Sequence, residues 1–292
     1  MTPLRNIAVL GPKNTFSDIA ADKFLKKSGL KLKKLFARDI DEVFSVVEKG
    51  KAVMGIAPVE NALHGTVRET LDCLFQSKVH IISEISLPVH HCLISLSNSN
   101  TRGIKRILSH YQALGQCKKY LKKHFPNASL ESFQSTTAAI KRLQNSSDKS
   151  IAVIAPEVAA NQNGLRILAK NIEDKKDNAT VFVIIGKGRI SEKPTTDSKS
   201  KTPTTSEQKI RSKTSIAFHF SKDSPGSLFT VFKDFADAGI NMTKIESRPT
   251  KTKFGDYIFY LDFDGLLSDP KVRKTLEKVA RKVAKLKILG SY

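Results

Sequence analysis

The sequence has no tryptophan and only three cysteines among its 292 residues. Cys73, Cys92 and Cys117 lie far apart and form no Cys-x-x-Cys pair, so neither a zinc ribbon nor a disulfide framework is indicated. Free cysteines are typical of a reducing compartment, and we expect a cytoplasmic protein.

Long apolar runs are also missing. No segment approaches the roughly 18 apolar residues that a membrane helix requires. The N-terminus leads into only four apolar residues, Ile7 to Leu10, which is too short for the core of a signal peptide. We therefore expect no membrane partner and no secretion.

The charge is strongly one-sided, with 49 Lys and Arg against 28 Asp and Glu, a formal net charge of +21. Such a surplus is found in proteins that bind nucleic acid, acidic surfaces or anionic small molecules. The lysines are spread along the chain, and five tyrosines without tryptophan offer few platforms on which bases stack. We expect no nucleic-acid partner and interpret the charge as a solvated basic surface.

The chain up to residue 188 alternates short apolar runs with segments of helical periodicity, which predicts an α/β fold. Polar residues gather directly after the predicted strands, where α/β proteins bind ligands. These groups are Lys13 to Ser17, Pro58 to Val67 and His110 to Cys117. Ser135 to Thr137 stand at the start of a predicted helix, where they could offer hydroxyl and N–H donors to a carboxylate or simply cap the helix.

The run from Asn178 to Gly186 has the composition of a buried strand. Thr180 is the one hydroxyl within its β-branched and aromatic stretch and stands at the strand's beginning. Threonine is also an ordinary strand former, so Thr180 becomes a candidate for chemistry only through the polar groups elsewhere.

No cofactor is indicated. The turn after the first predicted strand lacks the GxGxxG pattern that dinucleotide binding requires. His90 and His91 are adjacent, and adjacent residues of a strand face opposite sides, so they cannot bind one metal ion together without a break in the strand.

Five short motifs, in this order, resemble those of the prephenate dehydratase family. They are Gly11-Pro12-x-x-Thr15-Phe16-Ser17, Pro58-Val59-Glu60-Asn61, Ser109-His110-x-Gln112-Ala113-Leu114, Gly164-Leu165-x-Ile167-Leu168-Ala169 and Asn178-x-Thr180-x-Phe182. The resemblance implies a two-lobed catalytic domain of the periplasmic-binding-protein type, with the substrate in the cleft between the lobes.

The resemblance also implies an activity, the conversion of prephenate to phenylpyruvate with loss of carbon dioxide and water, in phenylalanine biosynthesis. It assigns catalysis to Thr180, and we name Glu60 and His110 as neighbours that support it. Burial would let Glu60 serve as a proton source, although a structural hydrogen bond is an equal alternative. The substrate-binding candidates are Thr15, Asn61, Ser109, Gln112, Thr136, Asn178 and Phe182.

Four residues depart from the family's usual pattern: Asn14 replaces Gly, Ala62 replaces Ser, Tyr111 replaces Pro and Val181 replaces Arg. Asparagine tolerates a positive φ, so the turn at position 14 can be kept. In a regular strand residue 181 faces away from residue 180. Two alternatives stay open: a lyase that prefers arogenate, and a catalytically impaired phenylalanine sensor.

Residues 189–213 are rich in serine, threonine and charge and have isoleucine as their only aliphatic residue type, so we expect a flexible linker between a catalytic domain of residues 1–188 and a domain of residues 214–292. The last segment predicts a ferredoxin-like βαββαβ unit. Two of its motifs resemble the phenylalanine-binding motifs of ACT regulatory domains, and the resemblance also implies a homodimer or homotetramer. The residues concerned are Gly226, Ser227, Leu228, Glu246, Ser247, Arg248 and Pro249.

Overall fold

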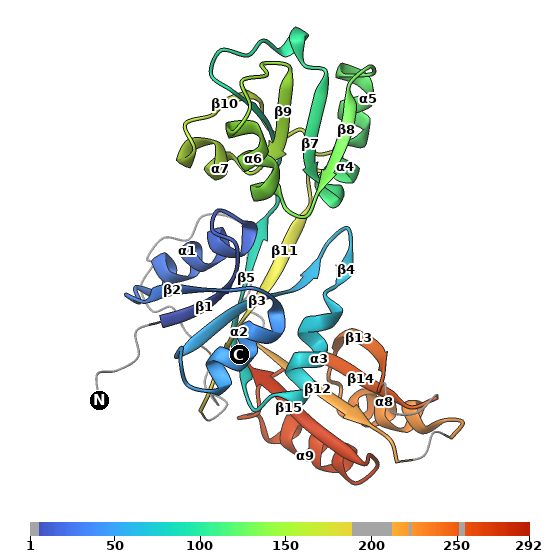
Figure 1. Cartoon of the computed structure of the whole chain (residues 1–292). Helices are drawn as coiled ribbons and strands as arrows, with labels where there is room; N and C mark the ends of the chain where they lie inside the picture. Colours follow the sequence, from blue (N-terminus) through green and yellow to red (C-terminus); the bar gives the residue numbers. More distant parts are fainter. Residues whose placement is uncertain (1–5, 189–211, 222–223, 251–254) are drawn as a thin grey trace, which may run out of the picture.

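The computed structural model describes residues 6–188, 212–221, 224–250 and 255–292. Figure 1 shows three bodies in a row: a lobe that holds β6 to β10, a lobe that holds β1 to β5 with β11, and a C-terminal domain. The expected linker falls outside the described residues as far as 211, and its last residue, Lys213, already begins a strand.

The N-terminal lobe is built on a mixed sheet in the order β5-β11-β3-β1-β2, with the short β4 added to β3. Apolar runs such as Ile7-Ala8-Val9 are fully buried at its centre. The elements of this lobe are β1 (Asn6–Leu10), α1 (Phe16–Ser28), β2 (Lys33–Ala37), α2 (Ile40–Glu48), β3 (Met54–Asn61), β4 (Gly65–Thr66), α3 (Arg68–Gln76), β5 (His80–Pro88) and β11 (Ala179–Gly186).

The second lobe has a five-stranded sheet in the order β10-β6-β9-β7-β8. Strands β7, β8 and β9 are parallel, so their carboxyl ends share one edge. The elements are β6 (Cys92–Ser95), a 3₁₀ turn (Thr101–Gly103), β7 (Arg106–His110), α4 (Tyr111–Gln116), α5 (Lys118–His124), β8 (Ser129–Phe133), α6 (Thr136–Gln144), β9 (Ile151–Ala155), α7 (Glu157–Gln162) and β10 (Arg166–Ala169).

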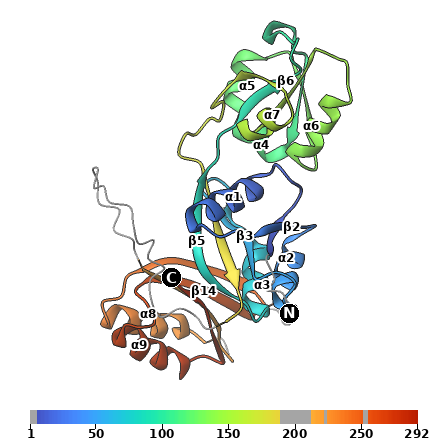
Figure 2. The same ribbon diagram turned by 90° about the vertical axis from the view of Figure 1, so that its left-hand side faces the viewer.

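The chain crosses between the lobes twice, from β5 to β6 and from β10 back to β11 (Figures 1 and 2). The two crossings are tied together, because the Val89 N–H donates to the Asn178 carbonyl (2.8 Å) and the Ile172 N–H donates to the His91 carbonyl (3.0 Å). The predicted two-lobed α/β architecture is confirmed. His90 and His91 lie in the first crossing rather than in a strand.

The C-terminal domain has the predicted βαββαβ order, with the sheet order β13-β14-β12-β15. Helices α8 and α9 cover one face of this sheet (Figure 1). The elements are β12 (Lys213–His219), α8 (Ser227–Asp237), β13 (Met242–Pro249), β14 (Tyr257–Asp264), α9 (Pro270–Ala280) and β15 (Lys285–Ser291). Across the described residues, no helix is both long and apolar enough to cross a membrane.

The C-terminal sheet continues into the sheet of the N-terminal lobe. Strand β15 pairs in parallel with β5 at Gly290 and Ile81, which makes one sheet of ten strands. A Cβ at position 290 would lie 2.5 Å from the Ile81 carbonyl oxygen, so only glycine allows this approach. The linker composition predicts two separate domains, and no local pattern predicts this junction.

Helix α3 lies between the N-terminal lobe and the C-terminal domain and is held by both. The Arg248 guanidinium binds the Asp72 carboxylate (2.8 Å), and the Tyr260 hydroxyl donates to the Leu71 carbonyl (3.1 Å). The Lys287 ammonium donates to carbonyls at the helix's carboxyl end, those of Leu74, Phe75 and Ser77. These carbonyls have no partner within the helix, so a cation is favourable there.

Candidate active site

A cavity of about 510 Å³ lies between the two lobes, and side chains of both lobes line it. Its volume is within the range of small-molecule sites, roughly 300 to 1,000 Å³. Helices α1, α3 and α6 all begin at this cavity. Their free N–H groups and dipoles make it favourable for an anion.

Thr180 lines this cavity, and its neighbour across the β11–β3 ladder is Asn61. The Asn61 Nδ2 donates to the Thr180 Oγ1 at 2.8 Å. The Asn61 Oδ1 accepts the N–H groups of Leu63 (3.0 Å) and His64 (3.1 Å), which fixes the orientation of the amide. The Thr180 hydroxyl thus accepts one hydrogen bond from the protein and keeps its own proton to donate.

Gln116, which the sequence analysis did not single out, connects the lobes. Its Oε1 accepts from Asn178 Nδ2 (3.0 Å) and from His91 Nε2 (2.7 Å), and its Nε2 donates to His64 Nε2 (2.8 Å). Gln116 follows the predicted Gln112 by four residues on α4, so the two share a helix face. That spacing is the signal that would have found it.

Two histidines of the cavity, His91 and His110, have pKa values below the ordinary range of the residue. Burial lowers the pKa of His91, which is only 2% exposed, and desolvation together with the nearby His64 lowers the pKa of His110. The Nε2 of His64 accepts a hydrogen bond from the Gln116 amide, so the ring proton of His64 is on Nδ1. Within the described residues, the buried Nδ1 of His91 has no hydrogen-bond partner.

The structure brings six of the ten predicted catalytic and substrate-binding residues to the cavity wall. They are Thr15, Asn61, His110, Gln112, Thr136 and Thr180. Asn14 adopts the expected positive φ (70°), and its N–H donates to the Asp18 carboxylate. The turn before α1 is therefore kept without glycine.

Three predicted residues support the cavity from behind instead of lining it. Ser109 is fully buried, and its hydroxyl donates to the Ile154 carbonyl (2.6 Å). Phe182 is 1% exposed and packs in the core of the N-terminal lobe. Asn178 is buried as well, and its Oδ1 accepts from the Asn61 Nδ2 that binds Thr180 (3.2 Å).

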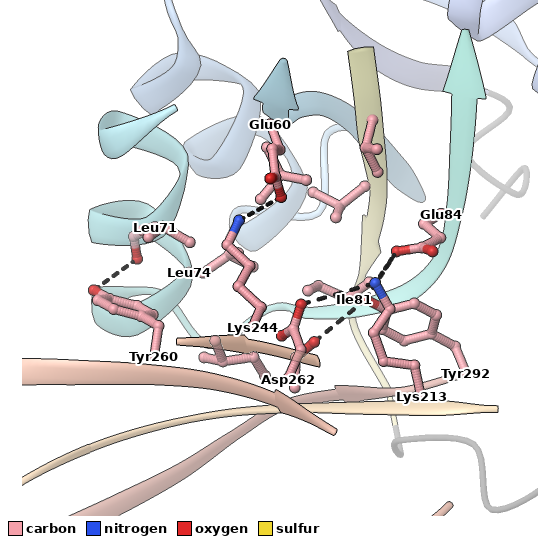
Figure 3. A pocket seen from close by; sticks show the side chains of 15 residues that line it. Glu60, Leu71, Leu74, Ile81, Glu84, Lys213, Lys244, Tyr260, Asp262 and Tyr292 are labelled. Carbon is pink, nitrogen blue, oxygen red and sulfur yellow. Dashed lines mark hydrogen bonds and ion pairs between the residues drawn. The ribbon is translucent and has the colours of Figure 1, made fainter. Parts of the chain in front are cut away.

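Glu60 points to the other side of the sheet. Its carboxylate forms an ion pair with the Lys244 ammonium of the C-terminal domain at 2.6 Å (Figure 3). Because side chains alternate along a strand, Asn61 facing the cavity turns Glu60 away from it. In this structure Glu60 is therefore not placed to give a proton to a ligand beside Thr180.

The same alternation separates Val181 from Thr180. Val181 lines a small cavity of about 80 Å³ between the N-terminal lobe and the C-terminal domain, which Glu60 and Lys213 also line. There Lys213 forms ion pairs with Glu84 (2.6 Å) and Asp262 (3.8 Å), as Figure 3 shows. Position 181 thus faces away from the candidate active site, as the strand pattern predicts.

The predicted phenylalanine-binding residues are divided between two surfaces. Arg248 and Glu246 face the N-terminal lobe, where Glu246 accepts from the Thr66 hydroxyl (3.4 Å). Ser247 and Pro249 alternate with them and are exposed. The remaining residues stand at the start of α8, where Gly226 has a φ of 86°, followed by Ser227 and Leu228.

A family model described as prephenate dehydratase matches residues 7–190. The chain belongs to the prephenate dehydratase family. A second model, the ACT domain, matches residues 214–281, so the predicted ACT domain is confirmed.

Several relatives are similar to this chain over nearly its whole length. The bifunctional chorismate mutase/prephenate dehydratase of Stutzerimonas stutzeri is 38% identical over 290 residues, which are 99% of this chain and 73% of the relative. The prephenate dehydratase of Methanocaldococcus jannaschii is 36% identical over 96% of this chain and 95% of its own. A crystal structure of prephenate dehydratase in complex with L-Phe from Arthrobacter aurescens matches with a TM-score of 0.83 and 30% identity, covering 98% of this chain and 89% of that chain.

We predict that Thr180→Val lowers kcat by roughly 100-fold or more, because it keeps the shape of the side chain and deletes its proton donor. The melting temperature should change little. Steady-state kinetics with prephenate and a thermal melt measure the two quantities. Thr243→Val, at an exposed position of β13, is the matched control and should leave kcat unchanged. A Thr180→Val enzyme with more than a tenth of the normal kcat would contradict a donor role.

Proposed function

We propose that the chain converts prephenate to phenylpyruvate, carbon dioxide and water. The observation that carries this proposal is the Thr180 hydroxyl, held by Asn61 in a cleft of suitable volume, in a chain of this family. The catalytic domain then comprises residues 1–188 and the regulatory domain residues 214–292.

The reaction breaks two bonds and consumes one proton. The electron pair of the bond to the departing carboxylate moves into the ring, the ring becomes aromatic, and the hydroxyl at the far end leaves. A proton from Thr180 makes that group leave as water, and solvent later restores the proton. A free threonine hydroxyl is a very weak acid, and the Asn61 N–H stabilises negative charge on its oxygen.

The remaining residues of the cleft position the substrate and limit its hydration. We assign Thr15, Gln112 and Thr136 to the polar contacts, since they stand on both lobes and line the cleft. His110 is held neutral, so it supports Thr180 as a hydrogen-bonding group rather than as a cation. Closing the lobes would strip water from the carboxylate that is lost, which favours its departure.

The decisive experiment incubates the purified chain with prephenate and follows phenylpyruvate. We expect turnover by the wild type, and a much lower kcat/KM with arogenate. The relatives favour prephenate, although an arogenate dehydratase from Arabidopsis thaliana is also 32% identical to this chain. Absence of phenylpyruvate would contradict the proposed function.

Val181→Arg, made in parallel, separates an active enzyme from an impaired sensor. In the structure the new guanidinium would enter the small interdomain cavity beside Lys213 and Lys244. We therefore expect Val181→Arg to lower the stability of the protein and not to raise kcat. A gain of about 100-fold over a nearly inert wild type would instead identify an enzyme that has lost its activity.

We propose further that phenylalanine binds the ACT domain and inhibits through helix α3. The carboxyl end of α3 is held by Lys287 and its middle by Arg248, while its first residues line the substrate cleft. A movement of the ACT domain would thus displace one wall of the cleft. Inhibition then follows if phenylalanine binds the two arrangements with different affinity.

Arg248 and Asp72 provide a test of the effector site. If Arg248 binds the carboxylate of phenylalanine, Asp72 competes with that carboxylate for the guanidinium. Calorimetric titration should then show weaker binding in Arg248→Ala and binding tighter by roughly tenfold in Asp72→Asn. Equal affinities in both variants and the wild type would limit Arg248 to holding the domains together.

We propose that the chain forms a homodimer or homotetramer through its ACT domains. Strand β13 is an end strand of the ten-stranded sheet, and Ile245 on it is 47% exposed. We expect sedimentation equilibrium to give two or four times the mass of one chain, and Ile245→Lys to lower it. Leu130→Lys, equally exposed on the second lobe, is the control. A monomeric wild type would refute the assembly.

A further inference from the structure

The candidate active site contains little fixed charge. Among the described residues that line it, Arg68 is the one lysine or arginine and the adjacent Glu69 is the one acidic residue. His91 and His110 have lowered pKa values, and His64 accepts a hydrogen bond at its ring nitrogen. A substrate anion therefore meets a single permanent cation in the wall of the cleft.

Arg68 is placed to meet a ligand. It is the first residue of α3, its side chain is exposed, and it forms no ion pair with the described residues. Other cations of this region, such as Lys244 and Arg248, are already paired with Glu60 and Asp72. The guanidinium of Arg68 is thus available for a carboxylate in a geometry that allows two parallel hydrogen bonds.

We infer that Arg68 binds the carboxylate of the substrate that is retained in the product. This inference rests on the proposed function, in which prephenate carries two carboxylates. The ring carboxylate must leave as neutral carbon dioxide, and a strong ion pair would stabilise its charged ground state against that loss. The side-chain carboxylate keeps its charge throughout, so a cation there contributes binding without opposing the chemistry.

The position of Arg68 agrees with binding of the side-chain carboxylate rather than the ring carboxylate. Both carboxylate-bearing groups are attached to one ring carbon, and the departing hydroxyl is on the opposite carbon. Thr180 stands at the beginning of β11, while Arg68 stands at the beginning of α3, on a different element of the same cleft. A ring placed between them presents its hydroxyl to one side chain and its side-chain carboxylate to the other.

Kinetics of Arg68→Gln with prephenate test the inference. We expect KM to rise roughly tenfold or more, as for a lost charge-assisted hydrogen bond, with kcat within about threefold of the wild type. Arg68→Lys should recover part of the loss. Arg102→Gln removes the same charge from an exposed turn of the second lobe that does not line the cleft, and it should behave as the wild type.

Product inhibition identifies the carboxylate. Phenylpyruvate retains only the side-chain carboxylate, so its inhibition constant should rise by the same factor in Arg68→Gln. An unchanged inhibition constant with a raised KM would assign Arg68 to the ring carboxylate and overturn the inference. Glu69→Gln should lower both constants, because it removes the negative charge beside the guanidinium.

Different results would refute the proposed activity and the proposed role of Arg68. A wild type that does not convert prephenate refutes the proposed function. An active wild type whose Arg68→Gln variant matches Arg102→Gln in KM and in phenylpyruvate inhibition refutes the role of Arg68 alone. Circular dichroism and a thermal melt of each variant confirm that the comparison is made between folded proteins.

Discussion

The pairing of β3 with β11 is the constraint on which the candidate site and the interdomain contact both depend. Thr180 is paired with Asn61, and Val181 with Glu60. The first pair faces the cleft, and the second faces the ACT domain. A β-bulge follows directly, between Val181 and Phe182, and shifts the register of the two strands there. The pairing that aims one residue pair at the cleft and the next at the ACT domain is therefore confined to the ends of the strands. The substrate site and the regulatory domain are thus separated by the thickness of one sheet.

Besides the paired strands β3 and β11, helix α3 is a second element that contacts both the ACT domain and the cleft. The helix is only nine residues long, so the Lys287 contact at one end and Arg68 at the other belong to one short rigid element. Around it, Lys244 and Arg248 lie on the same face of β13 and form ion pairs with Glu60 and Asp72 of the N-terminal lobe. A shift of β13 would change contacts of both elements at once, and the proposed inhibition through α3 depends on such a shift.

Much of the fold and half of the site follow from the sequence by local rules. Polar groups after predicted strands located Thr15, Asn61 and Gln112, because parallel strands bring their carboxyl ends to one edge. Thr136 was located instead by its place at the start of a predicted helix. Strands β2, β4 and β8 were not predicted. Strands β2 and β8 are edge strands with charged residues, such as Lys33 and Glu131, in place of an apolar run, and β4 has only two residues. The alternation that turns Val181 away from the cleft also turns away Glu60, its neighbour across the ladder, so the sequence contains the signal that excludes Glu60 from the site.

Other features depend on contacts that no local pattern contains. Ser109 belongs to a family motif, yet its role is decided by the Ile154 carbonyl on another strand. The junction at Gly290 requires β5, about 200 residues earlier in the chain, and a lone glycine in a strand does not reveal its partner. Gln116 had a usable signal in its spacing from Gln112. The partners that make it important, His64 and Asn178, come from the other lobe and from the second crossing.

The charge of the chain and the near-neutrality of its cleft serve different steps of the same reaction. A net charge of +21 raises the local concentration of a dianion around the molecule, since this attraction acts over roughly 10 Å in dilute salt. Inside the cleft, a second cation close to the ring carboxylate would hold the charge that the reaction has to remove. Helix ends and amide groups bind an anion more weakly than an ion pair does, and they leave decarboxylation less opposed. A cleft whose described residues include one arginine, two histidines of lowered pKa and a supported threonine therefore fits a reaction that must retain one carboxylate and release the other.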